Sequence, residues 1–143
     1  MTNKNQSIMP NENKAKVINR LKNDKDFELV FGKGTAIISE DRKIKAKYLL
    51  SNVTINGTIK FGITVTSKKG NSVWRNRIKR ILREALINEK ETLLNIANQI
   101  NKTLLIIFSP YSLDQNCSKK ISLREIKPSV FDILNKLKLS VTQ

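Results

Sequence analysis

The chain has 143 residues, 39% of them hydrophobic, and its 27 Lys or Arg against 12 Asp or Glu give a formal net charge of +15. This length and composition predict one domain with a modest core, and the charge points to a polyanionic partner: nucleic acid first, an anionic membrane surface a distant second. With no histidine and a single cysteine, Cys117, the chain cannot form His-based catalytic triads, an intrachain disulfide or a cysteine-rich zinc site.

The ends of the chain predict neither export nor a membrane anchor. No stretch approaches the roughly 20 apolar residues that span a bilayer, and the polar N-terminus lacks the apolar segment of a secretory signal. We therefore expect a cytoplasmic protein. Residues 1–16 are polar and without periodicity, which predicts a disordered tail. The folded domain is expected over 17–139, followed by a short tail at 140–143.

The first half of the chain predicts a helix and then strands. The helix is expected over 23–31, with candidate caps at its two ends (Asn23 or Asp24, and Gly32 or Gly34). Strands are expected near 35–38, over 45–54 and over 59–66, where apolar and polar residues alternate. Asn56-Gly57 predicts a hairpin between the last two strands.

A long helix is expected from Asn71 or Ser72 to about Asn98. Its apolar residues recur with helical spacing and form one stripe (Ile78, Ile81, Leu82, Ala85 and Leu86). Basic and amide residues fill the adjoining arc (Arg75, Asn76, Lys79, Arg80 and Arg83). The helix should therefore have a core face and a basic face side by side.

The last third predicts a buried strand, a loop and a final helix. Residues 102–109 are almost continuously apolar, as in a strand covered on both faces. Residues 110–120 are expected to be a loop, and Pro128 marks the start of the last helix. The element order α-β-β-β-α-β-α predicts a single-domain α+β sandwich around one mixed sheet.

The basic helix is the strongest functional signal. From 60 to 83 there are eight Lys or Arg and no Asp or Glu. A solvated surface is the ordinary explanation of a charge run, but here the first turns lack Glu partners and the helix dipole disfavours cations at this end. Arginine forks suit phosphates and can stack on bases, and Asn76 between Arg75 and Arg77 can bond a base edge, a ribose hydroxyl or metal-bound water.

Two weaker features have a structural and a functional interpretation. The turn Lys68-Lys69-Gly70-Asn71-Ser72 is either a plain helix cap or, with free N–H groups at the helix start, a phosphate site. Phe27 and Phe31 are four residues apart and hence on one helix face. They are either core residues or, together with Tyr48 if that strand face lies beside the helix, an aromatic floor that stacks unpaired bases.

Residues 62–84, GITVTSKKGNSVWRNRIKRILRE, resemble the signature of the bacterial ribonuclease P protein subunit, centred on Arg75-Asn76-Arg77. The similarity extends upstream through Asn19-Arg20-Leu21, Asp26-Phe27, Val30-Phe31 and Gly34-Thr35, and covers about 120 of the 143 residues.

The resemblance implies the small subunit of a ribonucleoprotein that removes the 5′ leader from precursor tRNA. In that family a catalytic RNA binds Mg²⁺ and performs the hydrolysis, so no catalytic residue, protein metal site or DNA partner is expected. The implied contacts to the catalytic RNA are Lys68, Lys69, Asn71, Arg75, Asn76, Arg77, Lys79, Arg80 and Arg83. The implied leader contacts are Arg20, Phe27, Phe31 and Tyr48. The family fold also implies a left-handed β-α-β crossover.

The main alternative is a ribosomal or ribosome-assembly protein, which binds RNA without a part in hydrolysis. The basic helix alone fits both. The longer signature and the phenylalanine pair favour ribonuclease P. A stand-alone nuclease fits less well, because such enzymes usually hold metal ions with clustered carboxylates. A double-stranded DNA binder fits least.

Overall fold

The computed structural model describes residues 18–51, 57–100, 102–118 and 120–141. One five-stranded sheet, in the order β1-β4-β5-β3-β2, is built from Ile18–Arg20, Thr58–Ile63, Thr103–Pro110, Ile44–Ser51 and Thr35–Ile38. The helices are α2 (Asp24–Lys33), α3 (Ser72–Asn88), α4 (Lys90–Gln99) and α5 (Leu123–Val141). The sheet is mixed, because β4 runs parallel to β1 and β5 whereas β3 is antiparallel to both β2 and β5.

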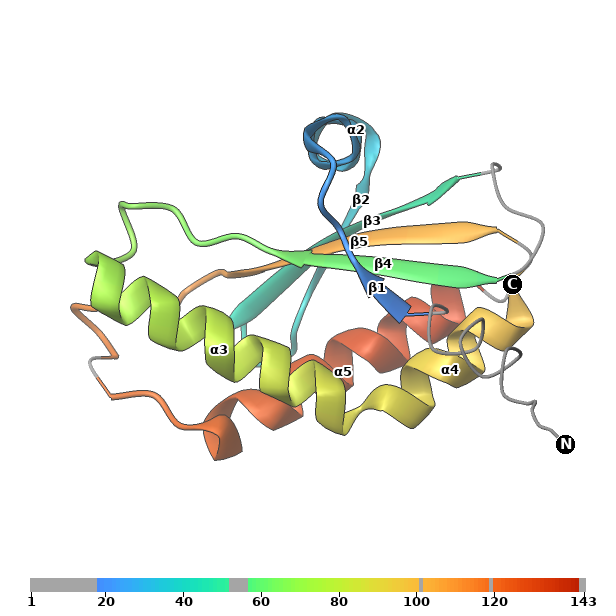
Figure 1. The fold of residues 1–143 in the computed structure, drawn as a ribbon. Helices are drawn as coiled ribbons and strands as arrows, with labels where there is room; N and C mark the ends of the chain where they lie inside the picture. The colour runs from blue at the N-terminus through green and yellow to red at the C-terminus, as the bar shows by residue number, and fades with distance from the viewer. Residues whose placement is uncertain (1–17, 52–56, 101, 119, 142–143) are drawn as a thin grey trace, which may run out of the picture.

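Helices cover both faces of the sheet. Helix α2 crosses one face, and α3, α4 and α5 form a layer on the other (Figure 1). The central strand β5 therefore contributes to two cores. Leu104, Ile106 and Phe108 face the three-helix layer, whereas Leu105 and Ile107 face α2. The expectation of a strand buried on both sides is confirmed.

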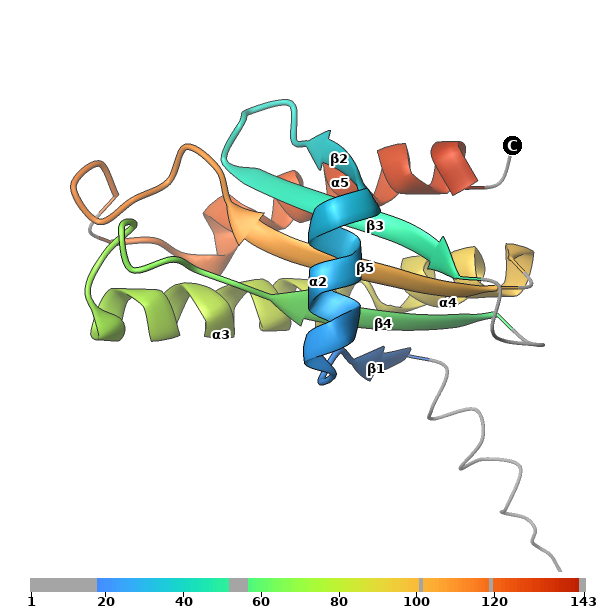
Figure 2. The same ribbon diagram turned by 90° about the horizontal axis from the view of Figure 1, so that it is seen from above.

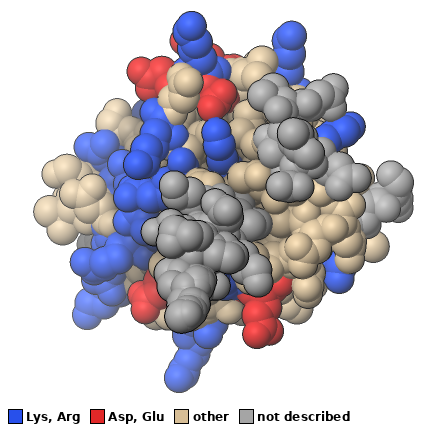
Figure 3. Space-filling model, turned by 45° about the vertical axis from the view of Figure 1, so that its right-hand side comes forward, with Lys and Arg blue, Asp and Glu red and all other residues tan. Residues whose placement is uncertain are grey.

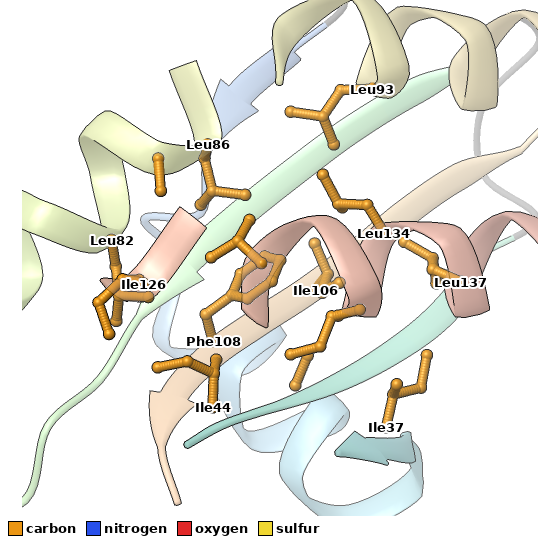
Figure 4. Close-up of a cluster of buried hydrophobic side chains, with 14 of the residues drawn as sticks. Ile37, Ile44, Leu82, Leu86, Leu93, Ile106, Phe108, Ile126, Leu134 and Leu137 are labelled. Carbon is orange, nitrogen blue, oxygen red and sulfur yellow. The ribbon is translucent and has the colours of Figure 1, made fainter. Parts of the chain in front are cut away.

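The larger core lies between the sheet and the three-helix layer. Phe108 and Ile106 from β5 meet Leu82 and Leu86 of α3 and the inner side of α5 (Figure 4). Phe108 and Leu82 are fully buried. At about 25 cal/mol per Å² of apolar surface, this burial is the main stabilising term, and it fixes α3 by one face only. The other face of α3 remains available for a partner.

The connection from β4 through α3 and α4 to β5 is left-handed. In Figure 2 the two parallel strands run the same way and the helices lie behind the sheet. Seen from the helix side with the strands pointing up, β5 is to the left of β4. Such connections are right-handed in about 98% of cases, so the crossover implied by the family resemblance is a true exception here.

Local capping explains where α2 and α3 begin. The Asn23 side chain accepts a hydrogen bond from Lys25 N–H at 2.9 Å, and the Asn71 side chain accepts one from Trp74 N–H at 2.9 Å. Both residues have extended backbones, as N-caps do. At the other end of α2, Gly34 N–H bonds Val30 O. The predicted first helix and its caps are confirmed.

The predicted hairpin at Asn56-Gly57 is wrong. Strands β3 and β4 do not pair with each other, because β5 lies between them and bonds to both. Burying the apolar β5 in the middle of the sheet outweighs the local turn signal. Asn56 itself lies outside the described residues, as do residues 1–17 with the predicted tail.

The predicted long helix is two helices. Glu89, with φ −102° and ψ 27°, ends α3 and precedes α4. Its N–H bonds Leu86 O and its carbonyl accepts from Leu93 N–H, so the break leaves both groups paired. The turn there allows α4 to bury Leu93 and Ile96 against the sheet. No Gly or Pro marks this break in the sequence.

The last helix begins five residues before the expected start. Helix α5 starts at Leu123, and Pro128 lies inside it. Ile126 is fully buried, so core packing extends the helix through a proline that removes one backbone donor. The helix ends at Val141, which makes part of the predicted tail helical. Strand β1 was not expected either; it pairs with β4 at the sheet edge.

The β2–β3 turn is tied to α5. Asp41 accepts hydrogen bonds from the Ser129 hydroxyl at 2.6 Å and the Ser39 hydroxyl at 2.7 Å, and from Lys43 N–H at 3.0 Å. Burial opposes ionisation, but these donors and the Lys43 charge outweigh it and hold the pKa of Asp41 below its usual value. Arg42 completes the turn with a left-handed φ of 63°.

Candidate nucleic-acid interface

Helix α3 carries an uncompensated basic face. Its five cations are Arg75, Arg77, Lys79, Arg80 and Arg83, and the ion pairs among the described residues all lie elsewhere. Lys and Arg side chains gather in a broad band over one side of the molecule, where Asp and Glu are few (Figure 3). Such a surface concentrates the field that attracts a polyanion.

The start of α3 is capped internally. Asn71 N–H donates to the Gln115 side chain at 2.8 Å, and the Asn71 side chain caps Trp74 N–H. These two N–H groups are therefore not open to a phosphate, and the cap interpretation of Asn71 is the one that the geometry supports. The other interpretation, a phosphate site at this turn, would have to do without these two N–H donors.

Two arginines of α3 are held in place by backbone carbonyls. Arg75 Nε donates to Gly70 O at 3.1 Å, and an Arg77 Nη donates to Ile121 O at 3.1 Å. Each keeps further donors for a ligand, because a guanidinium has five N–H groups. The Nε atom of Arg83 is buried without a hydrogen-bond partner among the described residues.

The loop before α5 braces the start of α3. Trp74, only 4% exposed, donates its indole N–H to Ser118 O at 2.9 Å. In the same loop, Cys117 N–H bonds Asp114 at 2.8 Å and lowers the pKa of that carboxyl. The hydrogen bond from the Cys117 side chain to Asp114 raises the pKa of the thiol. A braced helix start presents its arginines in a fixed geometry, which lowers the ordering cost of binding.

A groove of about 630 Å³ lies on the sheet face that α2 crosses. It is lined by Phe31, Lys45, Lys47, Thr64, Thr66, Lys69, Ile107, Ser109, Pro110 and Tyr111. Among the residues that the structure describes, three lysines and no acidic residue line it. Lys69 is also close in sequence to the Asn71 cap, so the groove opens beside the start of α3.

Phe27 and Phe31 form a pair but have different environments. Their ring centroids are 6.4 Å apart. Phe27 packs on the small core under α2, where a β-carbon on Gly62 would come within 2.8 Å of its ring. Phe31 is 47% exposed and lines the groove. Phe27 therefore positions α2, and Phe31 is the ring available for stacking.

Tyr48 is not part of the groove. Successive side chains of β3 point to opposite faces of the sheet. Those of Ile44, Ala46 and Tyr48 face the three-helix core, on the side of the sheet away from α2. The condition for an aromatic floor with Phe31 is thus not met. Tyr111 takes that place: it is 38% exposed and lines the same groove as Phe31.

Arg20 is also separate from the groove. Its partner in the β1–β4 register is Phe61, which packs against the three-helix core, so Arg20 points to that side of the sheet edge. Arg20 lines a hollow at the β1 edge together with Lys60 of β4 and with Lys22, Asn23 and Asp26 at the start of α2. Arg20 therefore lies beside the start of α2 at the sheet edge and does not line the groove that contains Phe31.

Lys45 and Lys47 of the groove were missed from the sequence, whereas Lys69 is among the catalytic-RNA contacts that the family resemblance implies. Lys47 Nζ donates to Phe31 O at 2.9 Å, and Lys69 Nζ donates to Tyr111 O at 2.5 Å. Lys45 Nζ lies 5.7 Å from the centre of the Tyr111 ring. The alternation of Lys45 and Lys47 with buried neighbours would have placed both on one face. Nothing in the sequence brings Tyr111 to them.

The described residues contain no group of three or more His, Cys, Asp or Glu side chains that could hold a metal ion. Within the same residues, no helix is long and apolar enough to cross a membrane.

An arginine-rich helix face that has no ion-pair partner within the described part of the chain, together with a lysine-lined groove with exposed rings, defines an RNA-binding α+β protein. The ribonuclease P family model matches residues 16–129, and the chain belongs to this family. It is 30% identical to the ribonuclease P protein component of Alkaliphilus metalliredigens over 122 residues, 85% of this chain and 95% of that protein. It is 39% identical to that of Bacillus velezensis over 75 residues, 61% of that protein.

Solved structures agree with the fold. The Staphylococcus aureus RNase P protein matches with a TM-score of 0.61 and 27% identity, over 87% of this chain and 97% of that one. A mutant of that protein with defective mRNA degradation activity matches at 25% identity with a TM-score of 0.61, over 94% of this chain and 98% of that one. The Thermotoga maritima RNase P protein, at 21% identity, shares the fold with a TM-score of 0.63 over 82% of this chain and 96% of that one.

Proposed function

We propose that the chain is the protein subunit of a ribonuclease P ribonucleoprotein and assists a catalytic RNA in removing the 5′ leader from precursor tRNA. The observation that carries this proposal is the adjacency of two surfaces. The groove under α2 and the basic face of α3 meet at the turn that contains Lys69 and Asn71. A single-stranded RNA bound in the groove would therefore extend toward an RNA bound to α3.

Helix α3 is assigned to the catalytic RNA. Arg75, Asn76, Lys79, Arg80 and Arg83 lie along the arc beside its core stripe. Arginine forks bind phosphate oxygens with two parallel hydrogen bonds, and the neutralised phosphates release counterions. Arg77 lies at the margin of this arc and Lys68 lies in the turn before the helix, and both complete the contact.

The groove is assigned to the single-stranded leader. Phe31 and Tyr111 offer ring faces on which unpaired bases stack, and Lys45, Lys47 and Lys69 offer charge for the backbone. Stacking contributes about 1–3 kcal/mol per base and depends little on sequence. Such a groove suits leaders of varied sequence.

Magnesium is assigned mainly to the catalytic RNA, because the chain has no histidine and its 12 acidic residues are spread along the sequence. The protein's part is electrostatic. Its cations reduce repulsion between phosphates where the RNA folds closely, so fewer magnesium ions are needed to hold the active fold.

The experiment compares precursor tRNA carrying a long leader with leaderless tRNA, each titrated against the cognate catalytic RNA with and without the protein. The proposal requires the protein to tighten binding of the leader-bearing substrate by more than tenfold and to leave leaderless tRNA almost unchanged. The ribosomal alternative requires equal effects, and that result would refute leader binding. An unstructured mRNA tests the activity associated with the Staphylococcus aureus relative; the isolated protein is expected to leave it intact.

A further inference from the structure

Helix α5 has an outer face that the proposed function does not use. On its inner side, Ile126, Leu134 and Leu137 point into the core (Figure 4). At 100° per residue, a second set falls within an arc of about 80° on the outer side. The set is Arg124, Lys127, Phe131, Asn135 and Lys138, here called the α5 stripe.

The α5 stripe combines cations with an exposed aromatic ring. Phe131 is 47% exposed, so part of its ring is open to a partner. Arg124 and Lys127 lie about two turns and one turn before it on the helix and are exposed, with no acidic partner among the described residues. Arg124 lies in the first turn of the helix, where the dipole disfavours a cation.

The acidic residues of α5 lie away from this stripe and are engaged. Asp132 pairs with Lys136 at 3.1 Å and accepts Glu40 N–H at 2.7 Å, and Glu125 lies 3.9 Å from Lys43. Charges of opposite sign are thus paired on one flank of the helix, whereas Arg124 and Lys127 on the other flank have no acidic partner among the described residues. This segregation suits an anionic partner that also offers a flat apolar surface.

The stripe begins close to the α3 surface. The Arg77 guanidinium binds Ile121 O at 3.1 Å, which brings a cation of α3 next to the chain segment that leads into α5. Arg124 follows three residues later. Helices α3 and α5 both lie on the face of the sheet away from α2 (Figure 1), and Arg77 is the cation of α3 that reaches the segment before Arg124.

We propose that the α5 stripe is a further RNA-binding surface, which holds a single-stranded segment of the catalytic RNA. Its cations contact phosphates, and Phe131 stacks one unpaired base. From Arg124 to Lys138 the helix rises about 21 Å, enough for a short strand of about four nucleotides, the low end of single-strand site sizes. This inference rests on the proposed function.

The first test measures affinity of the full-length protein for the cognate catalytic RNA over a range of KCl concentrations. Arg124→Gln with Lys127→Gln should reduce the slope of log K against log [salt] by about 1.4, the value for two contacts to a single strand. The matched control, Lys25→Gln with Lys90→Gln, removes equal charge at exposed sites on α2 and α4 and should leave the slope unchanged.

The second test separates stacking from charge. Phe131→Ala should weaken binding about 5- to 150-fold without changing the salt slope, and Phe131→Trp should restore the affinity. A photoreactive benzophenone amino acid at position 131 should cross-link to a segment of the catalytic RNA other than the one captured from position 80.

The outcomes are distinguishable. If the unchanged protein binds the catalytic RNA but the α5 variants match the control, the α5 inference is overturned and the proposed function stands. Cross-linking from position 131 to a second copy of the chain would overturn it as well. The same holds if the α5 variants lose affinity for phosphatidylserine vesicles and keep their affinity for the catalytic RNA. If the unchanged protein does not bind the catalytic RNA, both proposals fall.

Discussion

Replacing Phe31 with alanine should weaken binding of precursor tRNA that carries a long leader and should leave binding of leaderless tRNA almost unchanged. The ring is 47% exposed and lines the groove, and it is not part of either buried core. A stacked base contributes about 1–3 kcal/mol, so Phe31→Ala should lower affinity for a long-leader substrate about 5- to 150-fold. Half-exposure limits the loss of folding stability to about 1–2 kcal/mol.

Leu29 provides the matched control for this substitution. It lies on the same helix, is 38% exposed and is absent from the groove lining. Leu29→Ala should therefore cost similar stability and leave leader affinity unchanged. Binding is measured by titrating the assembled complex with labelled long-leader and leaderless substrates, and stability by thermal unfolding. Equal losses for both substrates would show that Phe31 acts only by supporting the fold.

Three further substitutions test other parts of the structure. Arg80→Gln should reduce the salt slope of catalytic-RNA binding by about 1, read from titrations at several KCl concentrations, because it removes one phosphate contact. Asp41→Asn should cost about 1 kcal/mol at neutral pH by weakening the bond from Ser129. Since the folded pKa of Asp41 is lowered, its stabilisation is present above the unfolded pKa of 3.8 and is lost as pH falls through the folded pKa. Acid unfolding curves of Asp41→Asn should be flatter there; an unchanged curve would contradict the role given to this carboxylate. Gly62→Ala should destabilise the fold by about 1–3 kcal/mol by displacing the Phe27 ring, and Phe27→Leu in the same chain should restore part of the loss on thermal unfolding.

Local sequence signals predicted those parts of the fold that depend on local physics. The caps at Asn23 and Asn71 are set by side chains that bond N–H groups two or three residues away. The apolar run of β5 requires cover on both faces wherever the strand lies. The basic arc of α3 follows from helical spacing alone.

The failures concern pairings between distant segments. The hairpin failed because β5, far along the chain, inserts between β3 and β4. The family resemblance implies Tyr48 as a leader contact, on the condition that its strand face lies beside the first helix. The imperfect alternation of the strand leaves this face undecided, because a shift of one residue moves a side chain to the other face. Only the pairing with β5 settles its direction.

The residues that meet around the groove and the start of α3 could not be predicted from local sequence either, because they come from distant segments. Tyr111 reaches Lys69 across 42 residues, and Gln115 reaches Asn71 across 44. These contacts depend on the crossover that returns the chain beside the start of α3. The family resemblance supplied that crossover, whereas periodicity and charge could not.

The central claim is that this protein serves an RNA catalyst and does not itself cut RNA. The most direct measurement is cleavage of precursor tRNA at low magnesium by the cognate catalytic RNA alone, by the protein alone, and by both together. The account predicts slow cleavage by the RNA, none by the protein, and strong stimulation on mixing. Cleavage by the protein alone, or no stimulation on mixing, would contradict it.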